Sequence, residues 1–164
     1  MNTLRVVLLI GLFMSITFGY GQQRLPQSQP PFNPVAGVDE IMKSIVDPLA
    51  WTVFRSVGTI MTEQRIEEIA PKNDGEWEAV RSAAMGLAEG GNLLMFESRT
   101  SDKEPDWITM SQQLIRRSLD AAEAAKTKDA EKLLIVGGDV YEVCESCHLL
   151  YMKFETWQRW RWKR

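Results

Sequence analysis

The stretch NDGEWEAVRSAAMGLAEGGNLL, residues 73–94, decides the fold class. Its apolar and small residues recur every three or four positions, which is the period of one face of an α-helix. This face consists of Trp77, Val80, Ala84, Leu87, Gly91 and Leu94. Asn73 or Asp74 is suited to cap the first turn, because a short polar side chain accepts hydrogen bonds from the free backbone N–H groups there. The stretch therefore predicts an amphipathic helix from about Gly75 to Ser98.

A second stretch, residues 38–57, has the same period and predicts the first helix of the chain. Its apolar face consists of Val38, Ile41, Met42, Ile45, Leu49, Val53 and Val57. Pro48 interrupts this stretch. Proline lacks a backbone N–H and disfavours helical geometry at the residue before it, here Asp47. We therefore expect the helix to kink at Pro48 or to restart there.

Two more helices are predicted in the second half of the chain. One begins at Pro105 and ends at a turn at Thr127 and Lys128, and the other runs from about Asp129 beyond Tyr151. The face of the former consists of Trp107, Met110, Leu114, Ser118, Ala121 and Ala125. No segment shows the alternation of apolar and polar residues that is typical of a half-buried strand. Four amphipathic helices of about 20 residues with mostly short connections predict an all-α fold, an antiparallel four-helix bundle.

The N-terminal part of the chain has the composition of an export signal followed by a leader. The hydrophobic run VVLLIGLFMSITF, residues 6–18, follows a start with one basic residue and precedes small residues. Because the run is shorter than a typical membrane span, it predicts a signal peptide over residues 1–21, with an uncleaved N-terminal anchor as the alternative. The Pro- and Gln-rich residues 22–37 predict an extended leader. We therefore expect the helical domain, residues 38–157, to be exported to the periplasm.

The charge of the chain argues against a nucleic-acid partner. It has 19 Lys and Arg against 22 Asp and Glu, a formal net charge of −3, whereas binding to phosphates depends on a basic surface. The last ten residues of the sequence, ETWQRWRWKR, are rich in Trp and basic residues. We treat residues 158–164, in which Trp alternates with Arg and Lys, as a basic tail. Such a tail can contact an anionic membrane surface, dock an acidic redox partner, or extend the last helix over the end of the bundle.

Both cysteines and the only histidine of the chain lie within five positions, CESCH, residues 144–148. At 100° per residue, the side chains of Cys144, Cys147 and His148 leave the predicted last helix within an arc of about 100°. The same face continues through Leu133, Gly137, Val140 and Tyr141 before the motif and through Tyr151 after it. The three residues therefore form one chemical face.

Three chemistries compete for this face. A redox dithiol normally stands at a helix N-terminus after a strand, whereas this motif lies about fifteen residues inside a helix. A structural zinc site needs four protein ligands, whereas the chain has two cysteines and one histidine. The number of ligands still allows a Cys2His site whose fourth ligand is water. The spacing C-x-x-C-H is the attachment signature of a c-type haem, with Cys144 and Cys147 bound to the porphyrin and His148 ligating the iron. Covalent attachment fits an exported protein, because thiols that are not otherwise used tend to oxidise outside the cytoplasm. We therefore expect one covalently attached haem c per chain.

The single histidine restricts the ligand on the other side of the iron. Once His148 is the proximal ligand, the sixth position holds a methionine, a weaker group or water, or is open. We expect Met42, on the apolar face of the first helix, to be the distal ligand, with Met85 and Met95 as the next candidates. Met152 follows His148 by one helical turn and is therefore expected on the same side of the porphyrin as the histidine.

Two pairs of glycines interrupt the predicted helices, Gly90–Gly91 and Gly137–Gly138. Each glycine costs about 1 kcal/mol relative to alanine in a helix interior, so the pairs need a structural reason. One reason is a close crossing of two helices, and the other is a bulky planar group that lies against the backbone. The pattern leaves both open.

With CESCH near the end of its last predicted helix, the chain resembles the class II cytochromes c, the cytochrome c prime group. The resemblance covers roughly residues 38–154. It implies that His148 is the proximal ligand and that a residue of the first helix lies on the distal side. In low-spin members of the family that residue is a ligating methionine, and in high-spin members it is a non-ligating apolar residue. Tyr151 matches an aromatic residue that is common three positions after the histidine, which implies packing against the haem.

The chain departs from the family pattern at two places. Met152 stands where arginine is common, and the first helix lacks the usual early basic residue. The partner of the haem propionates is therefore open, and the candidates are Arg81, Arg99, Arg116 and Arg117. Class II relatives often pair through two helices, so a homodimer is a candidate assembly.

These observations predict a periplasmic mono-haem c-type cytochrome that transfers one electron to or from a redox partner protein. The alternative is a high-spin haem protein with an open distal site that binds small gases such as nitric oxide. A sensor or accessory subunit that uses the bundle as a scaffold is a third class. No general-base constellation accompanies the motif, so an enzyme is not predicted.

Overall fold

The computed structural model describes residues 33–100, 105–152 and Thr156. The predicted signal peptide (1–21), most of the leader (22–37) and the basic tail (158–164) lie outside the described residues. Within the described part of the chain, no helix is long and apolar enough to cross a membrane.

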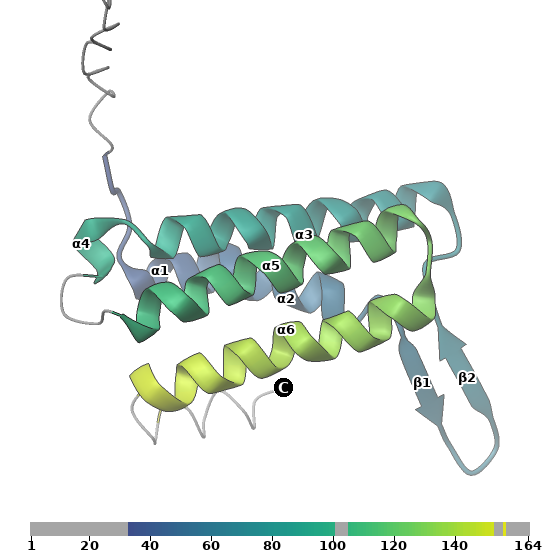
Figure 1. The fold of residues 1–164 in the computed structure, drawn as a ribbon. Coiled ribbons are helices and arrows are strands. Elements are labelled where there is room, and N and C mark those ends of the chain that lie inside the picture. Colours follow the sequence, from purple (N-terminus) through teal and green to yellow (C-terminus); the bar gives the residue numbers. More distant parts are fainter. Residues whose placement is uncertain (1–32, 101–104, 153–155, 157–164) are drawn as a thin grey trace, which may run out of the picture. The chain divides into compact units, whose positions relative to one another are not determined.

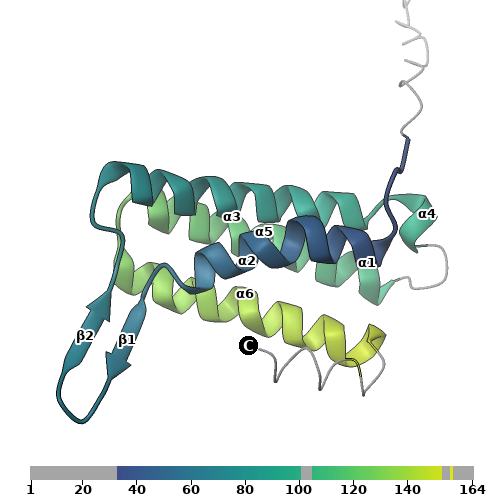
Figure 2. The ribbon, with the colours of Figure 1, turned by 180° about the vertical axis from the view of Figure 1, so that it is seen from behind.

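Three long helices form the body of the protein and pack together (Figure 1). They are α3 (Asp74–Leu94), α5 (Asp106–Lys126) and α6 (Ala130–Tyr151). α3 packs against α5, α5 packs against α6, and successive long helices run in opposite directions (Figure 2). The prediction of a mostly helical chain is therefore confirmed. A short helix, α4 (Glu97–Thr100), follows α3.

The first predicted helix is divided into three pieces: α1 (Val38–Ile41), the π-helix η1 (Met42–Val46) and α2 (Asp47–Phe54). The restart predicted at Pro48 is present one residue earlier, at Asp47, because the wider turn of η1 ends where proline cannot continue the hydrogen-bond ladder. A π-turn inserts an extra residue into the helical period. As a result the buried face moves to Val46 and Ala50, and Ile45, which was predicted on the buried face, is only half-buried.

An antiparallel hairpin follows α2, and it contradicts the prediction that the chain contains no strand. β1 (Gly58–Met61) pairs with β2 (Ile66–Ile69) in the register Gly58 opposite Ile69 and Met61 opposite Ile66. The turn is closed by the Thr62 N–H, which donates to the Arg65 carbonyl at 2.9 Å. Nearly all hairpin side chains are exposed on both faces. Because neither face is buried, the alternation of apolar and polar residues that reveals most strands is missing.

The ends of the helices follow local side-chain chemistry. Asn73 caps α3: its Oδ1 accepts a hydrogen bond from the Glu76 N–H at 3.0 Å, and the Glu76 carboxylate accepts one from the Lys72 N–H at 2.6 Å. Asp129 caps α6 in the same way through the Lys132 N–H at 2.9 Å. Two predicted ends were too late, since α3 ends at Leu94 rather than Ser98 and α6 ends at Tyr151, where Met152 has extended backbone angles.

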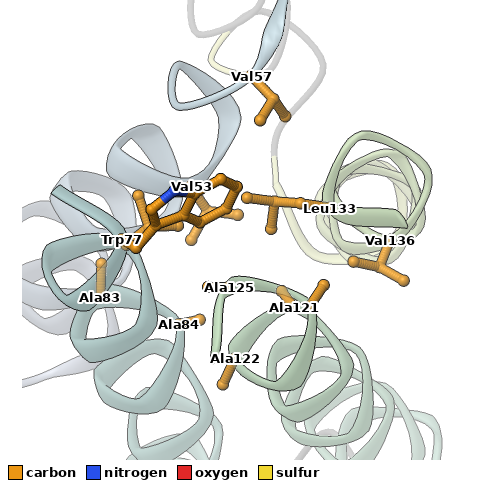
Figure 3. Close-up of a cluster of buried hydrophobic side chains, with 12 residues drawn as sticks. Val53, Val57, Trp77, Ala83, Ala84, Ala121, Ala122, Ala125, Leu133 and Val136 are labelled. Atoms are coloured by element: carbon orange, nitrogen blue, oxygen red, sulfur yellow. The ribbon is translucent and has the colours of Figure 1, made fainter. Parts of the chain in front are cut away.

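The core lies between the long helices and α2. All six residues of the predicted α3 face are buried. In one of the two buried clusters, the side chains of Val53, Trp77 and Leu133 meet over small alanines of α3 and α5 (Figure 3). The alanines let the helix axes approach closely, while the large residues fill the space next to them.

The two glycine pairs have different surroundings. A Cβ on Gly91 would lie 2.6 Å from Ile115 Cγ1 and 2.9 Å from the Ser111 carbonyl oxygen, and one on Gly90 would lie 3.1 Å from Val46 Cγ2. The first pair therefore marks a close helix crossing. A Cβ on Gly137 or Gly138 would meet nothing within 4 Å among the described residues, so a crossing does not explain the second pair.

Ser118 offers a test of the packing of α5. Its side chain is fully buried, and its Oγ has no hydrogen-bond partner among the described residues. Because an unsatisfied buried polar group costs about 1–3 kcal/mol, Ser118→Ala is expected to raise the free energy of unfolding by about 1 kcal/mol in urea denaturation. Ser82→Ala is the matched control, since Ser82 is exposed within α3, where alanine gains helix propensity and removes only an exposed 3.3 Å hydrogen bond to Glu78. Equal effects of the two variants would contradict the burial argument.

Candidate cofactor site

An open apolar cleft runs along the C-terminal half of α6. It has an empty volume of about 970 Å³, its open mouth included. The opposite side of the cleft comes from α1, η1 and α2, together with the end of α3 and the first turns of α5. Cofactor sites in proteins are concave and predominantly apolar with a few polar groups, and the lining of this cleft has that character.

α6 brings the three residues of the CESCH motif into the lining of this cleft. Cys144, Cys147 and His148 are half-buried, and all three line the cleft. The face continues through Leu133, Gly137 and Val140, which are buried. The prediction that the motif forms a single face of one helix is confirmed, because regular α-helical geometry continues to Tyr151.

Burial changes the chemistry of the thiol of Cys147. Desolvation raises the pKa of Cys147 to about 11, because an apolar environment disfavours the thiolate. A reactive dithiol requires the opposite shift, toward a stable thiolate. No disulfide joins Cys144 to Cys147. These properties do not fit a redox dithiol.

The described part of the chain also fails to assemble a zinc donor set. No group of three or more His, Cys, Asp or Glu side chains comes together there in a way that could hold a metal ion. A structural zinc site needs four such donors, and a catalytic one needs three.

The raised pKa of Cys147 predicts slow alkylation. At pH 8 the thiolate fraction is about a hundred-fold smaller at a pKa of about 11 than at the ordinary value of 9.0, and only the thiolate reacts with iodoacetamide. In haem-free Cys144→Ala protein we expect Cys147 to be alkylated roughly a hundred-fold more slowly than in the same protein unfolded in urea. Intact mass against time measures both rates. Similar rates in the folded and unfolded protein would contradict the burial of this thiol.

The structure brings one of the predicted methionines to the cleft and leaves two outside it. Met42 lines the cleft from η1. Met85 is 38% exposed on α3, and neither Met85 nor Met95 belongs to the lining. Met110 of α5 and Met152 line it as well. Met110 was missed as a site residue because its position in the helical period is that of an ordinary core residue.

Tyr151, for which the resemblance implied packing against the haem, lies at the end of α6. It is half-buried but is absent from the lining of the cleft. Its ring instead meets the Trp107 ring edge to face, with the centroids 5.0 Å apart. Trp107 is buried and its Nε1 donates to the Leu94 carbonyl at 2.7 Å. The contact between the Tyr151 and Trp107 rings thus packs the end of α6 against the start of α5.

The four arginines predicted as propionate partners lie away from the cleft lining. Arg81 pairs with Glu78, Arg117 pairs with Asp120 and Asp139, and Arg116 is exposed beside Arg117. Buried Arg99 donates to the carbonyls of Ala36 and Leu93.

Among the described basic residues, the one that lines the cleft is Lys43. Its ammonium group donates to Asp39 at 2.6 Å, and this hydrogen bond raises the pKa of Lys43 above its usual value. Lys43 and the carboxylates of Asp39 and Asp47 make this side of the lining charged. Lys43 directly follows Met42, so adjacency to the predicted ligand was the signal that could have identified it.

An aromatic group forms part of the wall on α2. Phe54 lines the cleft and lies between two other rings, Trp51 at 5.6 Å and Tyr141 at 5.9 Å, both edge to face. The guanidinium of Arg55 covers the outer ring, 4.7 Å from the Trp51 centroid. These contacts fix the Phe54 ring in the wall of the cleft.

Comparisons with protein-family models, curated protein sequences and solved structures gave no match. The functional conclusion therefore depends on the residues and the geometry of the cleft.

Proposed function

We propose that this protein is an exported mono-haem c-type cytochrome that transfers single electrons. One haem c is attached covalently through Cys144 and Cys147, and His148 is the proximal ligand of its iron. The observation that carries this proposal is that these three residues share one half-buried face of α6 and line one apolar cleft. These three residues are the only cysteines and the only histidine in the sequence.

The residues of the cleft fit such a group. Each thiol adds its S–H across one vinyl group of the porphyrin, which forms a C–S bond without an oxidant or reductant. A protonated thiol such as that of Cys147 becomes a neutral thioether, so no charge has to be buried. Phe54, Leu94 and Leu114 give the cleft apolar walls. A haem bound there supplies one-electron redox chemistry at its iron.

Met42 is the proposed distal ligand. It lines the cleft from η1, across from the helix that carries His148. Its thioether is neutral and soft, and Met/His ligation raises the reduction potential of haem iron. Lys43 replaces the four arginines as the proposed partner of the haem propionates, because it is the described lysine or arginine that lines the same cleft.

We also propose that the domain is an antiparallel four-helix bundle of the class II cytochrome c type. In this interpretation α1, η1 and α2 together act as the first helix. Contacts of α2 with both α3 and α6 support it, because they close a ring of four neighbours. The hairpin is then an insertion between the first and second helices.

The remaining parts of the proposal concern location and partners. The hydrophobic run at residues 6–18 directs the chain to the periplasm, and a redox protein is the partner. The Trp- and Arg-containing tail, residues 158–164, is the proposed contact with a membrane surface or with that partner. A homodimer is the proposed assembly, and no enzymatic activity is proposed.

Mass and absorption test the central proposal. The full chain, produced with its own N-terminal segment in a bacterium that attaches c-type haem, is expected to exceed its polypeptide mass by one haem and to stay coloured after extraction with acid acetone. Colourless protein, or colour that the acetone removes, would refute it. The reduced protein is then exposed to carbon monoxide, and ready binding at neutral pH would support the open distal site of the gas-binding alternative.

A further inference from the structure

The cleft is lined by three methionine side chains from three separate parts of the chain. Met42 lies on η1, Met110 lies in the first turns of α5, and Met152 follows α6. All three are half-buried. The cleft therefore offers more than one soft, neutral sulfur donor.

Two of these methionines lie on elements other than the one that carries the histidine. α6 contributes Cys144, Cys147 and His148, whereas Met42 and Met110 belong to η1 and α5. Met152 is different, because its backbone N–H donates to the His148 carbonyl at 2.9 Å and fixes it to the same end of α6. Met42 and Met110 are therefore the methionines placed to approach a group held on α6 from its other side.

Core packing does not explain the position of Met110. Met42 packs against the buried cluster that contains Ile41 and Trp107, whereas Met110 belongs to neither of the two clusters of the described residues. Ser111 and Leu114, its neighbours on α5, line the cleft with it. Met110 therefore belongs with the residues that line the cleft rather than with the two buried clusters.

We propose that Met110 is a second thioether donor for the position opposite His148, and that Met42 and Met110 can replace one another there. This inference rests on the haem proposed above. Methionine is unbranched and has three rotatable side-chain bonds, so a rotamer change moves its sulfur without moving the backbone. Loss of one donor then leaves the iron ligated by sulfur and closed to small gases.

The test removes each sulfur while keeping the volume of the side chain. Met42→Leu, Met110→Leu and the double variant are produced as haem-loaded full chains, because a Leu-for-Met exchange conserves volume and usually costs little stability. Met85→Leu is the matched control, since Met85 is exposed on α3 outside the cleft. For each protein we measure haem content by mass, the weak long-wavelength band of sulfur-ligated ferric haem, and carbon monoxide binding to the reduced form.

Each single variant is expected to keep the sulfur band and to exclude carbon monoxide, while the double variant loses the band and binds the gas. Loss of the band in Met42→Leu or in Met110→Leu alone would overturn the inference. So would wild-type protein that carries covalent haem but shows no sulfur band. Wild-type protein without covalent haem would instead refute the proposed function itself, so the two failures are distinguishable.

Discussion

Replacement of both Cys144 and Cys147 by alanine is expected to give a colourless protein whose mass is that of the mature polypeptide alone. The two thiols are the attachment points in the proposed function, and both line the cleft from α6. Alanine favours the helix and leaves no polar group unsatisfied, so α6 should still form. Intact mass and absorption after acid acetone extraction measure the loss of covalent haem, and far-ultraviolet circular dichroism measures the remaining helix.

Ser146→Ala is the control for this loss, because Ser146 lies between the two cysteines and is exposed. It should retain one covalently bound haem. Covalent colour that persists in the double cysteine variant would contradict the proposed attachment. A single variant, Cys147→Ala, should keep one thioether bond at Cys144 and therefore retain haem in part of the molecules.

The second large effect is expected at the crossing of α3 and α5. Gly91→Ala should lower the free energy of unfolding by about 1 kcal/mol, since overpacking of a close contact costs about 1–3 kcal/mol and alanine returns about 1 kcal/mol of helix propensity. The added Cβ would lie 2.9 Å from the Ser111 carbonyl oxygen, which belongs to the backbone and cannot rotate away. Urea denaturation of the variant and the wild type measures the difference.

Gly138→Ala provides the matched control on another helix. Gly138 is exposed, and a Cβ there would meet nothing within 4 Å among the described residues. Alanine should therefore raise the free energy of unfolding by about 1 kcal/mol through helix propensity alone. If Gly91→Ala were also stabilising, α3 and α5 would not cross as closely as the structure places them.

Much of the helical structure could be predicted because its causes are local. Asn73 and Asp129 cap their helices through hydrogen bonds to residues three positions away, and these bonds need no other part of the chain. The common face of Cys144, Cys147 and His148 follows from helical geometry within a single turn. The hairpin at residues 58–69 was missed because its exposed strands lack the burial pattern that distant contacts impose.

The site was only partly predictable for the same reason. Met42 and His148 are more than a hundred positions apart, and their shared cleft depends on how η1 and α6 lie in the fold. Lys43 and Met110 had ordinary sequence patterns, and only the cleft distinguishes them from other surface and core residues. The contact of the Tyr151 ring with Trp107 likewise depends on how α5 and α6 pack, so local sequence could not predict it.

The amino-acid sequence by itself determined the long helices, the N-terminal caps of α3 and α6 and the single chemical face at residues 144–148, because hydrogen bonds and side-chain spacing within one or two turns are sufficient for these features. Only the tertiary structure decided which residues surround that face. The π-turn at residues 42–46 inserts one residue into the period of the first helix and so redirects its side chains. The packing of α3, α5 and α6 then sets which side chains line the cleft, because their positions depend on contacts between residues far apart in the chain.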